Sequence, residues 1–294
     1  MPPLLLRRAL LANASFSAAS GLIMVAAHSV LGNVLGPDVP AVYLLLGLGL
    51  LSFATGLAWL AARPRPLWVL GVVAADVGWI VGTTVLLAIF WADFEVAGVL
   101  AVAATNGVVA LLVVYQLRGL SRTFSVTGEP GRYEICVRVA THLPRERLWP
   151  VVADLGRIDQ HLQDLRSSRM EGDAAPGEGA VRTCENRRGQ RWSERCIEWR
   201  EGSSFDVRFL TDRPGFPFPF SDMVGGWRLV PTDAGCDVEV WWRVVPTRPW
   251  LAPLLLPVMA RGASGTFEAV VASMVAQAEG RPAGEAPQLR AAFC

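Results

Sequence analysis

Five ionisable side chains in the second half of this 294-residue chain are the best candidates for acid–base chemistry: Glu185, Glu194, Arg195, Glu198 and His161. Such groups transfer protons when a partner holds them in register with a substrate. Their spacing fixes no such pair, and charges of both signs along strands are typical of a solvated face. The sequence also contains no GxSxG nucleophile motif, phosphate loop or dinucleotide fingerprint. Binding is therefore favoured over catalysis, and catalysis stays open.

Asp76 is a further candidate, because it lies nine residues inside a long apolar stretch. A carboxylate deep in a membrane is costly unless it is protonated, paired or facing water. Asn106 lies on the next apolar stretch, and a helical rise of about 1.5 Å per residue brings the two to similar depths on antiparallel helices. We expect a hydrogen bond between Asp76 and Asn106. The alternative is a proton or ion path, which a single acid supports weakly.

The cysteines and histidines show no metal-ligand spacing. The five cysteines contain no CxxC, and the three histidines lie at no ligand spacing from them, so we expect neither a metal nor a cofactor. The charge pattern described below places the cysteines in a reducing compartment, so we expect free thiols. They are Cys136, Cys184, Cys196, Cys236 and Cys294.

Four apolar stretches, at residues 9–31, 41–62, 67–90 and 96–117, dominate the first half. Each is long enough for a transmembrane helix, since a hydrocarbon core of about 30 Å needs roughly 20 helical residues. Buried helices of a soluble bundle would instead have polar faces. These stretches are apolar all round, so we predict an α-helical membrane domain with four transmembrane helices over residues 1–120.

Arginines predict the orientation of these helices, because positive residues in short loops stay in the cytoplasm. They precede the first stretch, separate the second from the third and follow the fourth, whereas the other two loops carry only acids. Both termini are therefore predicted to be cytoplasmic, in a multi-pass protein of the inner membrane. A signal peptide at the N-terminus is the alternative, although Asn13 and three serines interrupt its apolar core.

The second half is predicted to be an α+β domain over residues 132–280, after a linker at 121–131. Residues 133–140 alternate with a period of two, as in a strand with one buried face. Two short helices follow Pro144, and residues 254–278 carry apolar side chains at helical spacing. Between them lie six more predicted strands, at residues 166–171, 180–186, 190–199, 204–211, 223–231 and 236–246. We expect residues 281–294 to form a flexible tail.

Short sequence segments, in addition to this order of elements, carry a resemblance to a known family. The relevant segments are LPRERLW at 143–149, GEGAVR at 177–182, SERCIEW at 193–199, WRLVP at 227–231 and VEVWW at 238–242. They resemble SRPBCC (START-like) domains, most closely the polyketide cyclase/dehydrase and lipid transport branch. The resemblance implies a helix-grip fold, with a curved antiparallel sheet around a long C-terminal helix and a cavity for a hydrophobic ligand. It implies no particular reaction. The first half resembles small four-helix bacterial membrane proteins of unknown role.

The predicted lining of that cavity consists of apolar residues that share one face of each strand or lie on the last helix. They are Phe205, Val207, Phe209, Met223, Trp227, Val240, Trp242, Phe267 and Val271. Such a lining favours an apolar ligand with few hydrogen bonds. Alternatively, these residues simply pack against the last helix and leave no space.

Two further apolar segments are candidates for contact with a membrane surface. Residues 215–220 carry three phenylalanines between prolines, and residues 250–259 carry a tryptophan and three consecutive leucines. Exposed aromatic residues are typical anchors at a membrane interface. The alternative is that both segments fold back onto the domain.

These observations favour a membrane-tethered cytoplasmic domain that binds a hydrophobic small molecule, such as a lipid, an isoprenoid or a polyketide-like compound. One alternative is a cyclase or dehydratase acting on a membrane-soluble substrate. Another is a channel, transporter or partner protein with a ligand-sensing domain. The expected partners are a hydrophobic molecule and the membrane, and the net charge of +1 argues against nucleic acid. The sequence predicts no oligomeric state.

Overall fold

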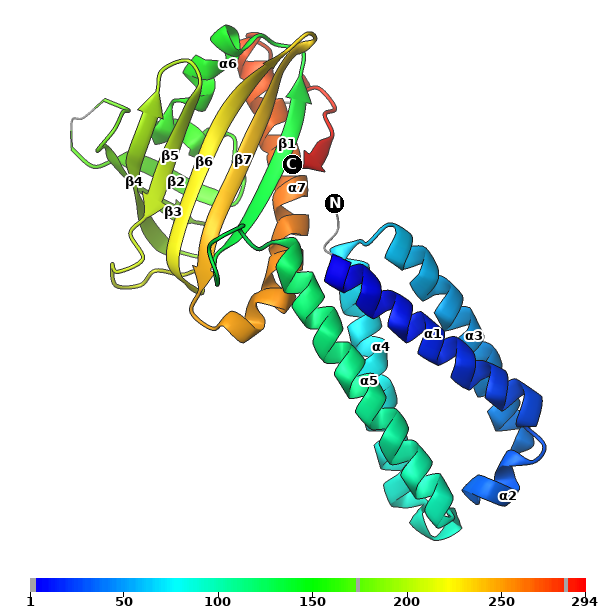
Figure 1. Ribbon diagram of the computed structural model, residues 1–294. Helices are drawn as coiled ribbons and strands as arrows, with labels where there is room; N and C mark the ends of the chain where they lie inside the picture. The colour runs from blue at the N-terminus through cyan, green and yellow to red at the C-terminus, as the bar shows by residue number, and fades with distance from the viewer. Residues whose placement is uncertain (1–3, 173–174, 283–284) are drawn as a thin grey trace. The chain divides into compact units, whose positions relative to one another are not determined.

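The computed structural model describes residues 4–172, 175–282 and 285–294, which divide into two units. The helical unit ends at Thr123, and the sheet unit comprises Phe124–Cys294 (Figure 1). Each unit has its own core and is described by itself.

Apolar helices build the helical unit. They are α1 (Leu4–Ala27), the short α2 (Leu31–Leu35), α3 (Pro40–Ala62), α4 (Pro66–Ile89) and α5 (Val96–Thr123), with a 3-10 turn at Trp91–Asp93. Pro40 and Pro66 stand in the first turn of their helices, where a missing N–H leaves no bond unmade. The first helix begins and ends a few residues earlier than predicted, and α5 continues past residue 117 to Thr123.

Glycines allow close packing of α1 against its neighbours. A Cβ at Gly21 would lie 2.8 Å from the carbonyl oxygen of Gly47 on α3, and one at Gly119 of α5 would lie 2.6 Å from the Cα of Leu6. Small residues at helix crossings let the two backbones approach closely and gain dispersion contacts. In contrast, α3 and α4 scarcely touch.

Within the described residues, five helices are long and apolar enough to cross a membrane by length and composition. Four of them, α1, α3, α4 and α5, form the helical unit, whose surface exposes many large apolar side chains. Examples are Leu22, Ile23, Leu45, Trp68, Ile89, Val96 and Leu100. The fifth candidate, Pro249–Ala278, is mostly α7 of the sheet unit. The structure thus gives several apolar helices and leaves the number of spans open.

The sheet unit contains one antiparallel sheet of eight strands in the order β2-β3-β4-β5-β6-β7-β1-β8. The first seven are β1 (Tyr133–Thr141), β2 (Leu165–Met170), β3 (Val181–Asn186), β4 (Arg191–Arg200), β5 (Ser204–Phe209), β6 (Phe220–Thr232) and β7 (Gly235–Pro246). Each lies within three residues of its predicted position. The short helices are α6 (Arg145–Val152) and a 3-10 segment (Leu155–Gln160).

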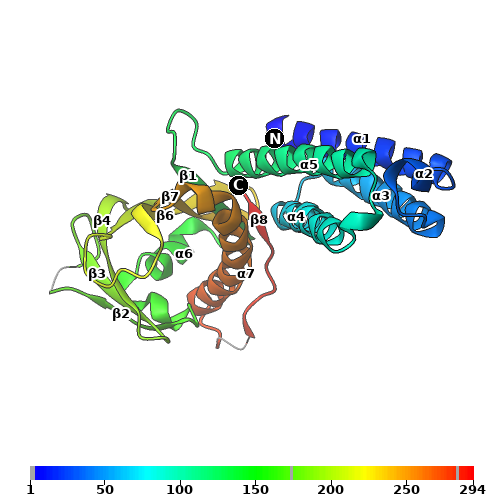
Figure 2. The ribbon, with the colours of Figure 1, turned by 90° about the horizontal axis from the view of Figure 1, so that it is seen from below.

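The sheet curves around the long helix α7 (Ala252–Ala278), so the unit resembles a helix grip (Figure 2). Ile135, Val137 and Val139 alternate along β1 and are at most 2 % exposed. The second half of α7 buries Val270, Val271, Met274 and Val275. The apolar side chains that make α7 look like a membrane span therefore form much of the core of this unit.

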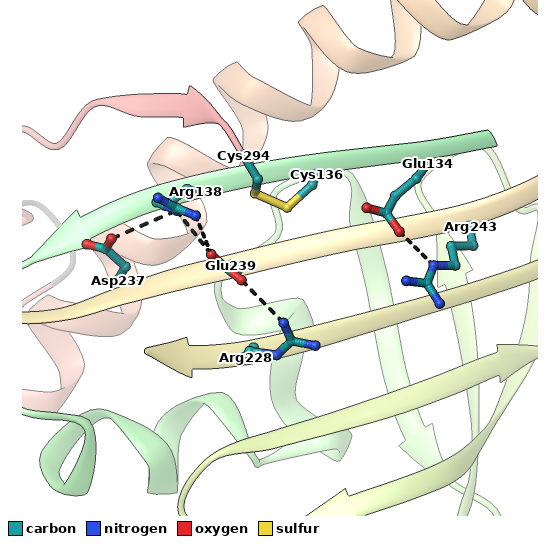
Figure 3. The surroundings of a disulfide bond; sticks show 8 residues. All are labelled: Glu134, Cys136, Arg138, Arg228, Asp237, Glu239, Arg243 and Cys294. Atoms are coloured by element: carbon teal, nitrogen blue, oxygen red, sulfur yellow. Dashed lines mark hydrogen bonds and ion pairs between the residues drawn. A yellow bond between two sulfur atoms is a disulfide. The ribbon is translucent and has the colours of Figure 1, made fainter. Parts of the chain in front are cut away.

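The C-terminal segment differs from the predicted flexible tail. Residues 283–284 lie outside the described residues, but Ala291–Phe293 form β8, which pairs with Val137–Val139 at the edge of β1. An edge strand presents unpaired N–H and C=O groups, and pairing with β8 gives some of these groups on β1 hydrogen-bond partners. The expectation that all thiols are free is also wrong, because Cys136 and Cys294 form a disulfide (Figure 3). Cys184, Cys196 and Cys236 are free and buried.

Candidate ligand-binding site

The concave face of the sheet carries the strand residues predicted to line a cavity. Phe205 on β5 lies opposite Trp227 on β6, which lies opposite Val240 on β7. Directly paired residues project from the same face, so these three form one row. Val207, Phe209 and Met223 follow the same alternation and are buried.

Helix α7 brings the aromatic members of this face together. The ring of Phe267 lies 5.5 Å from that of Trp227 and 4.9 Å from that of Trp242, between centroids. Trp242 stands opposite Gly225, where a Cβ would lie 3.0 Å from the indole. Val271, one turn beyond Phe267, is fully buried. All nine predicted residues therefore belong to one apolar layer between the sheet and α7.

Two tryptophans that the sequence did not single out extend this layer. The Trp199 ring on β4 stacks on Phe205 at 5.7 Å, and Trp149 on α6 lies 5.3 Å from Trp199. A bulge in β4 between Cys196 and Glu198 adds a residue, so Trp199 rather than Glu198 shares the face of Cys196. Strict alternation places Trp199 on the opposite face, so the pattern could not reveal it.

Three rings of this aromatic layer keep accessible surface. Phe205 is only 1 % exposed, whereas Trp199, Trp242 and Phe267 are partly exposed. Rings that are neither fully covered nor fully solvated offer an apolar contact surface to a small molecule.

A buried ion pair adjoins the aromatic layer. Arg182 on β3 donates to Glu194 Oε2 on β4 from Nε at 2.9 Å and Nη2 at 2.6 Å, and Trp192 Nε1 donates to Glu194 Oε1 at 2.7 Å. Both charged side chains are at most 6 % exposed, and Glu194 lies opposite Phe209. The interpretation of Glu194 as a solvated charge is therefore wrong: β3–β4 pairing turns it inward, where it needs a buried partner.

The other acid–base candidates do not converge. His161 is buried with Nδ1 2.9 Å from Ser273 Oγ of α7, and burial lowers its pKa, so the ring is neutral at pH 7. Glu185 pairs with Arg166 and Arg191 in a half-exposed cluster on the opposite face. Arg195 is exposed, and Glu198 pairs with Arg200. Among the described residues, these five side chains therefore form no acid–base pair aimed at one point.

The phenylalanine segment folds back onto the domain, as in the alternative to a membrane anchor. Phe218 contacts Trp192 at 5.2 Å and Phe209 at 6.2 Å, and Phe220 is 2 % exposed. These rings cover the end of the aromatic layer near Glu194. The other segment does expose apolar side chains, because Trp250, Leu254 and Val258 are 68 %, 42 % and 58 % exposed.

The sheet unit contains the part of the chain that matches a known protein family. Residues 134–279 match the family model described as polyketide cyclase / dehydrase and lipid transport. Residues 134–279 belong to this family. No curated protein matches the chain.

Solved structures with similarity to the cyclase-family domain share little sequence with it. Norcoclaurine synthase from Thalictrum flavum is 13 % identical over 50 % of this chain and 87 % of its own, with a TM-score of 0.40. The di-domain ARO/CYC BexL from the BE-7585A biosynthetic pathway is 14 % identical over 63 % and 62 %, with a TM-score of 0.41. A Thermobifida fusca protein is 22 % identical over 52 % and 97 %, with a TM-score of 0.40.

The helical unit, outside the cyclase-family domain, contains Asp76. Its Oδ2 accepts hydrogen bonds from Asn13 Nδ2 of α1 at 2.8 Å and Gln116 Nε2 of α5 at 3.0 Å. The expected bond to Asn106 is not formed, because Asn106 bonds to Thr83 and Thr84, two turns further along α4. The helical rise gives only an approximate depth for Asp76, so it could not distinguish Asn106 from Gln116 as its partner on α5.

The described residues contain no group of three or more His, Cys, Asp or Glu side chains that could hold a metal ion. In the cyclase-family domain, the polar groups nearest the aromatic layer are instead paired with each other. The arrangement is an apolar layer of aromatic rings beside paired polar groups, with the free, buried thiol of Cys196 on the same face of the sheet.

Proposed function

We propose that this protein binds a hydrophobic small molecule in its cyclase-family domain and that the helical unit tethers this domain to a membrane. The observation that carries the proposal is the aromatic layer between the sheet and α7, in which Trp199, Trp242 and Phe267 keep accessible surface. A lipid, an isoprenoid or a polyketide-like compound has the apolar surface that such a layer contacts. Membership of a family that includes polyketide cyclases and lipid transport proteins supports the same ligand class.

In this proposal, four helices cross the membrane: α1, α3, α4 and α5. They expose apolar side chains along their length, whereas α7 uses its second half as the core of the cyclase-family domain. The arginines at 7, 8, 63, 65, 118 and 122 support a cytoplasmic location for both termini. The parts are a membrane domain at 1–120, a linker at 121–131 and a binding domain at 132–280.

Tethering gives the proposal a physical logic. A molecule that partitions into the bilayer is concentrated near a domain attached to that bilayer, so binding requires no search through bulk water. The exposed residues Trp250, Leu254 and Val258 would suit contact with the headgroup region, where aromatic and aliphatic side chains insert.

The proposal is tested by identifying what the protein carries. The full chain is purified in a mild detergent, extracted with organic solvent, and the extract is compared by mass spectrometry with that of an unrelated four-span protein prepared from the same membranes. We expect one class of apolar compound enriched over the control. An extract that matches the control at every mass would contradict the proposal.

A further inference from the structure

The helical unit contains a partly open cavity of about 350 Å³, which lies in the size range of small-molecule sites. Residues of α1, α3, α4 and α5 line it, and most are apolar. Large ones among them include Phe16, Met24, Leu46, Leu50, Phe53 and Trp79. A bundle whose helices were fully packed would leave no such volume, since protein interiors are close-packed.

Asp76 places one charged group on this apolar wall. The side chain is 5 % exposed, and both of its hydrogen bonds, from Asn13 and Gln116, end on Oδ2. Among the described residues, Oδ1 accepts no hydrogen bond and Asp76 has no ion pair. The carboxylate thus has an unused acceptor beside a cavity that it lines.

The surroundings of Asp76 provide neutral donors but no positive charge. The arginines of the helical unit lie near the ends of the long helices, at residues 7, 8, 63, 65, 118 and 122. A carboxylate in apolar surroundings is stabilised most by a cation that also donates a hydrogen bond. Such a cation has to come from the molecule that occupies the cavity.

We propose that the helical unit binds an apolar molecule that carries a protonated amine. The ammonium group donates to Oδ1 of Asp76, and the apolar part lies against Phe16, Leu50 and Phe53. This site is separate from the aromatic layer of the cyclase-family domain. It gives the helical unit a binding role in addition to that of an anchor.

Gly49 provides a way to narrow the site. It lines the cavity, and a Cβ added there has no neighbour within 4 Å, so a larger side chain would project into empty space. Gly56 lies two turns further along α3, does not line the cavity and also has no neighbour within 4 Å of an added Cβ. Gly49→Leu therefore narrows the cavity, and Gly56→Leu is its matched control.

The test measures binding of octylamine to the full chain in lipid nanodiscs by native mass spectrometry, with octanol and octanoate as probes of equal length. We expect saturable binding of one octylamine, with octanol and octanoate weaker by about tenfold or more, as expected for loss of a charge-assisted hydrogen bond. Asp76→Asn should weaken octylamine binding by a similar factor. Gly49→Leu should weaken it, and Gly56→Leu should leave it unchanged.

Several results would overturn the proposal. One is octylamine binding that Asp76→Asn and Gly49→Leu leave unchanged, and another is octanol binding as tight as that of octylamine. Proton flux into liposomes that depends on Asp76, without any amine binding, would establish the proton path instead. Trp242→Ala, in the other unit, should leave octylamine binding intact, so failure of this site and failure of the proposed function are distinguishable.

Discussion

Arg182 and Glu194 form the most deeply buried ion pair among the described residues, and every oxygen of Glu194 is engaged. Arg182 also donates to the carbonyl of Leu155 at 3.1 Å, which ties the sheet to the 3-10 segment. Removing one partner of such a pair leaves an uncompensated buried charge, whereas replacing both by apolar residues is often tolerated.

Glu194→Gln should therefore destabilise the protein by about 3–5 kcal/mol. The midpoint of thermal unfolding, followed by tryptophan fluorescence in detergent, measures the loss. The double variant Arg182→Met with Glu194→Met should recover most of it. Glu185→Gln, in the half-exposed cluster on the opposite face, should cost about 1 kcal/mol or less. Equal stability of Glu194→Gln and wild type would contradict the structural role of the pair.

His161 makes stability depend on pH. Burial lowers its pKa below the usual 6.5, while Asp154 and Asp159 oppose that shift. The unfolded chain therefore binds the proton first as pH falls, so stability is lost between about pH 6.5 and the lower pKa of the folded state. In His161→Gln, the midpoint of thermal unfolding should change less between pH 7.5 and pH 5.5 than it does in the wild type. A wild-type slope in His161→Gln would contradict this account.

Among the elements, β8 shows how a short segment is held at a sheet edge. Only three residue pairs join it to β1, and the backbone N–H of Ala291 donates to Glu268 of α7 at 3.1 Å. The Cys136–Cys294 disulfide links positions 158 residues apart, so it restricts the unfolded chain strongly. On the same outer face of the sheet, Arg138 pairs with Glu239 and Arg243 with Glu134 (Figure 3).

Cys294→Ser should lower stability by about 2–5 kcal/mol under oxidising conditions and by far less in the presence of a reductant. Oxidised, unfolded wild-type protein should show three free thiols by titration. The cytoplasm keeps thiols reduced. If the domain is cytoplasmic, protein that is denatured and alkylated directly from cells should therefore have all five cysteines modified. Five free thiols in the oxidised purified protein would contradict the pairing of Cys136 with Cys294.

At the scale of the whole molecule, the arginines predict how the protein is oriented in the membrane. The arginine distribution predicts that a C-terminal green fluorescent protein fusion fluoresces and that a C-terminal alkaline phosphatase fusion is inactive. Replacing Arg63 and Arg65 by glutamine weakens the charge bias of that loop and should yield a mixed population. An active phosphatase on the wild-type chain would show the opposite orientation.

Much of the architecture follows from local sequence patterns. The strands lie within three residues of their predicted positions, and β1, β3 and β5 bury alternate residues, as a strand with one buried face does. What could not be predicted depends on contacts between distant segments. The bulge that turns Trp199 inward, the partners of Asp76 and the pairing of Cys294 with β1 each depend on tertiary register, which a single sequence does not specify.

The central claim, that the aromatic layer holds a hydrophobic molecule, is tested most directly by two adjacent tryptophans. Trp242 faces Phe267, whereas Trp241 lies on the opposite face under Arg243 and is also buried. Replacing either by alanine removes the same volume, so both variants disturb folding while only one alters the site. The quantity measured is the amount of apolar molecule that co-purifies per full-length chain. Trp242→Ala should lose about tenfold or more, and Trp241→Ala should match wild type; equal loss in both, or no loss in Trp242→Ala, would contradict the claim.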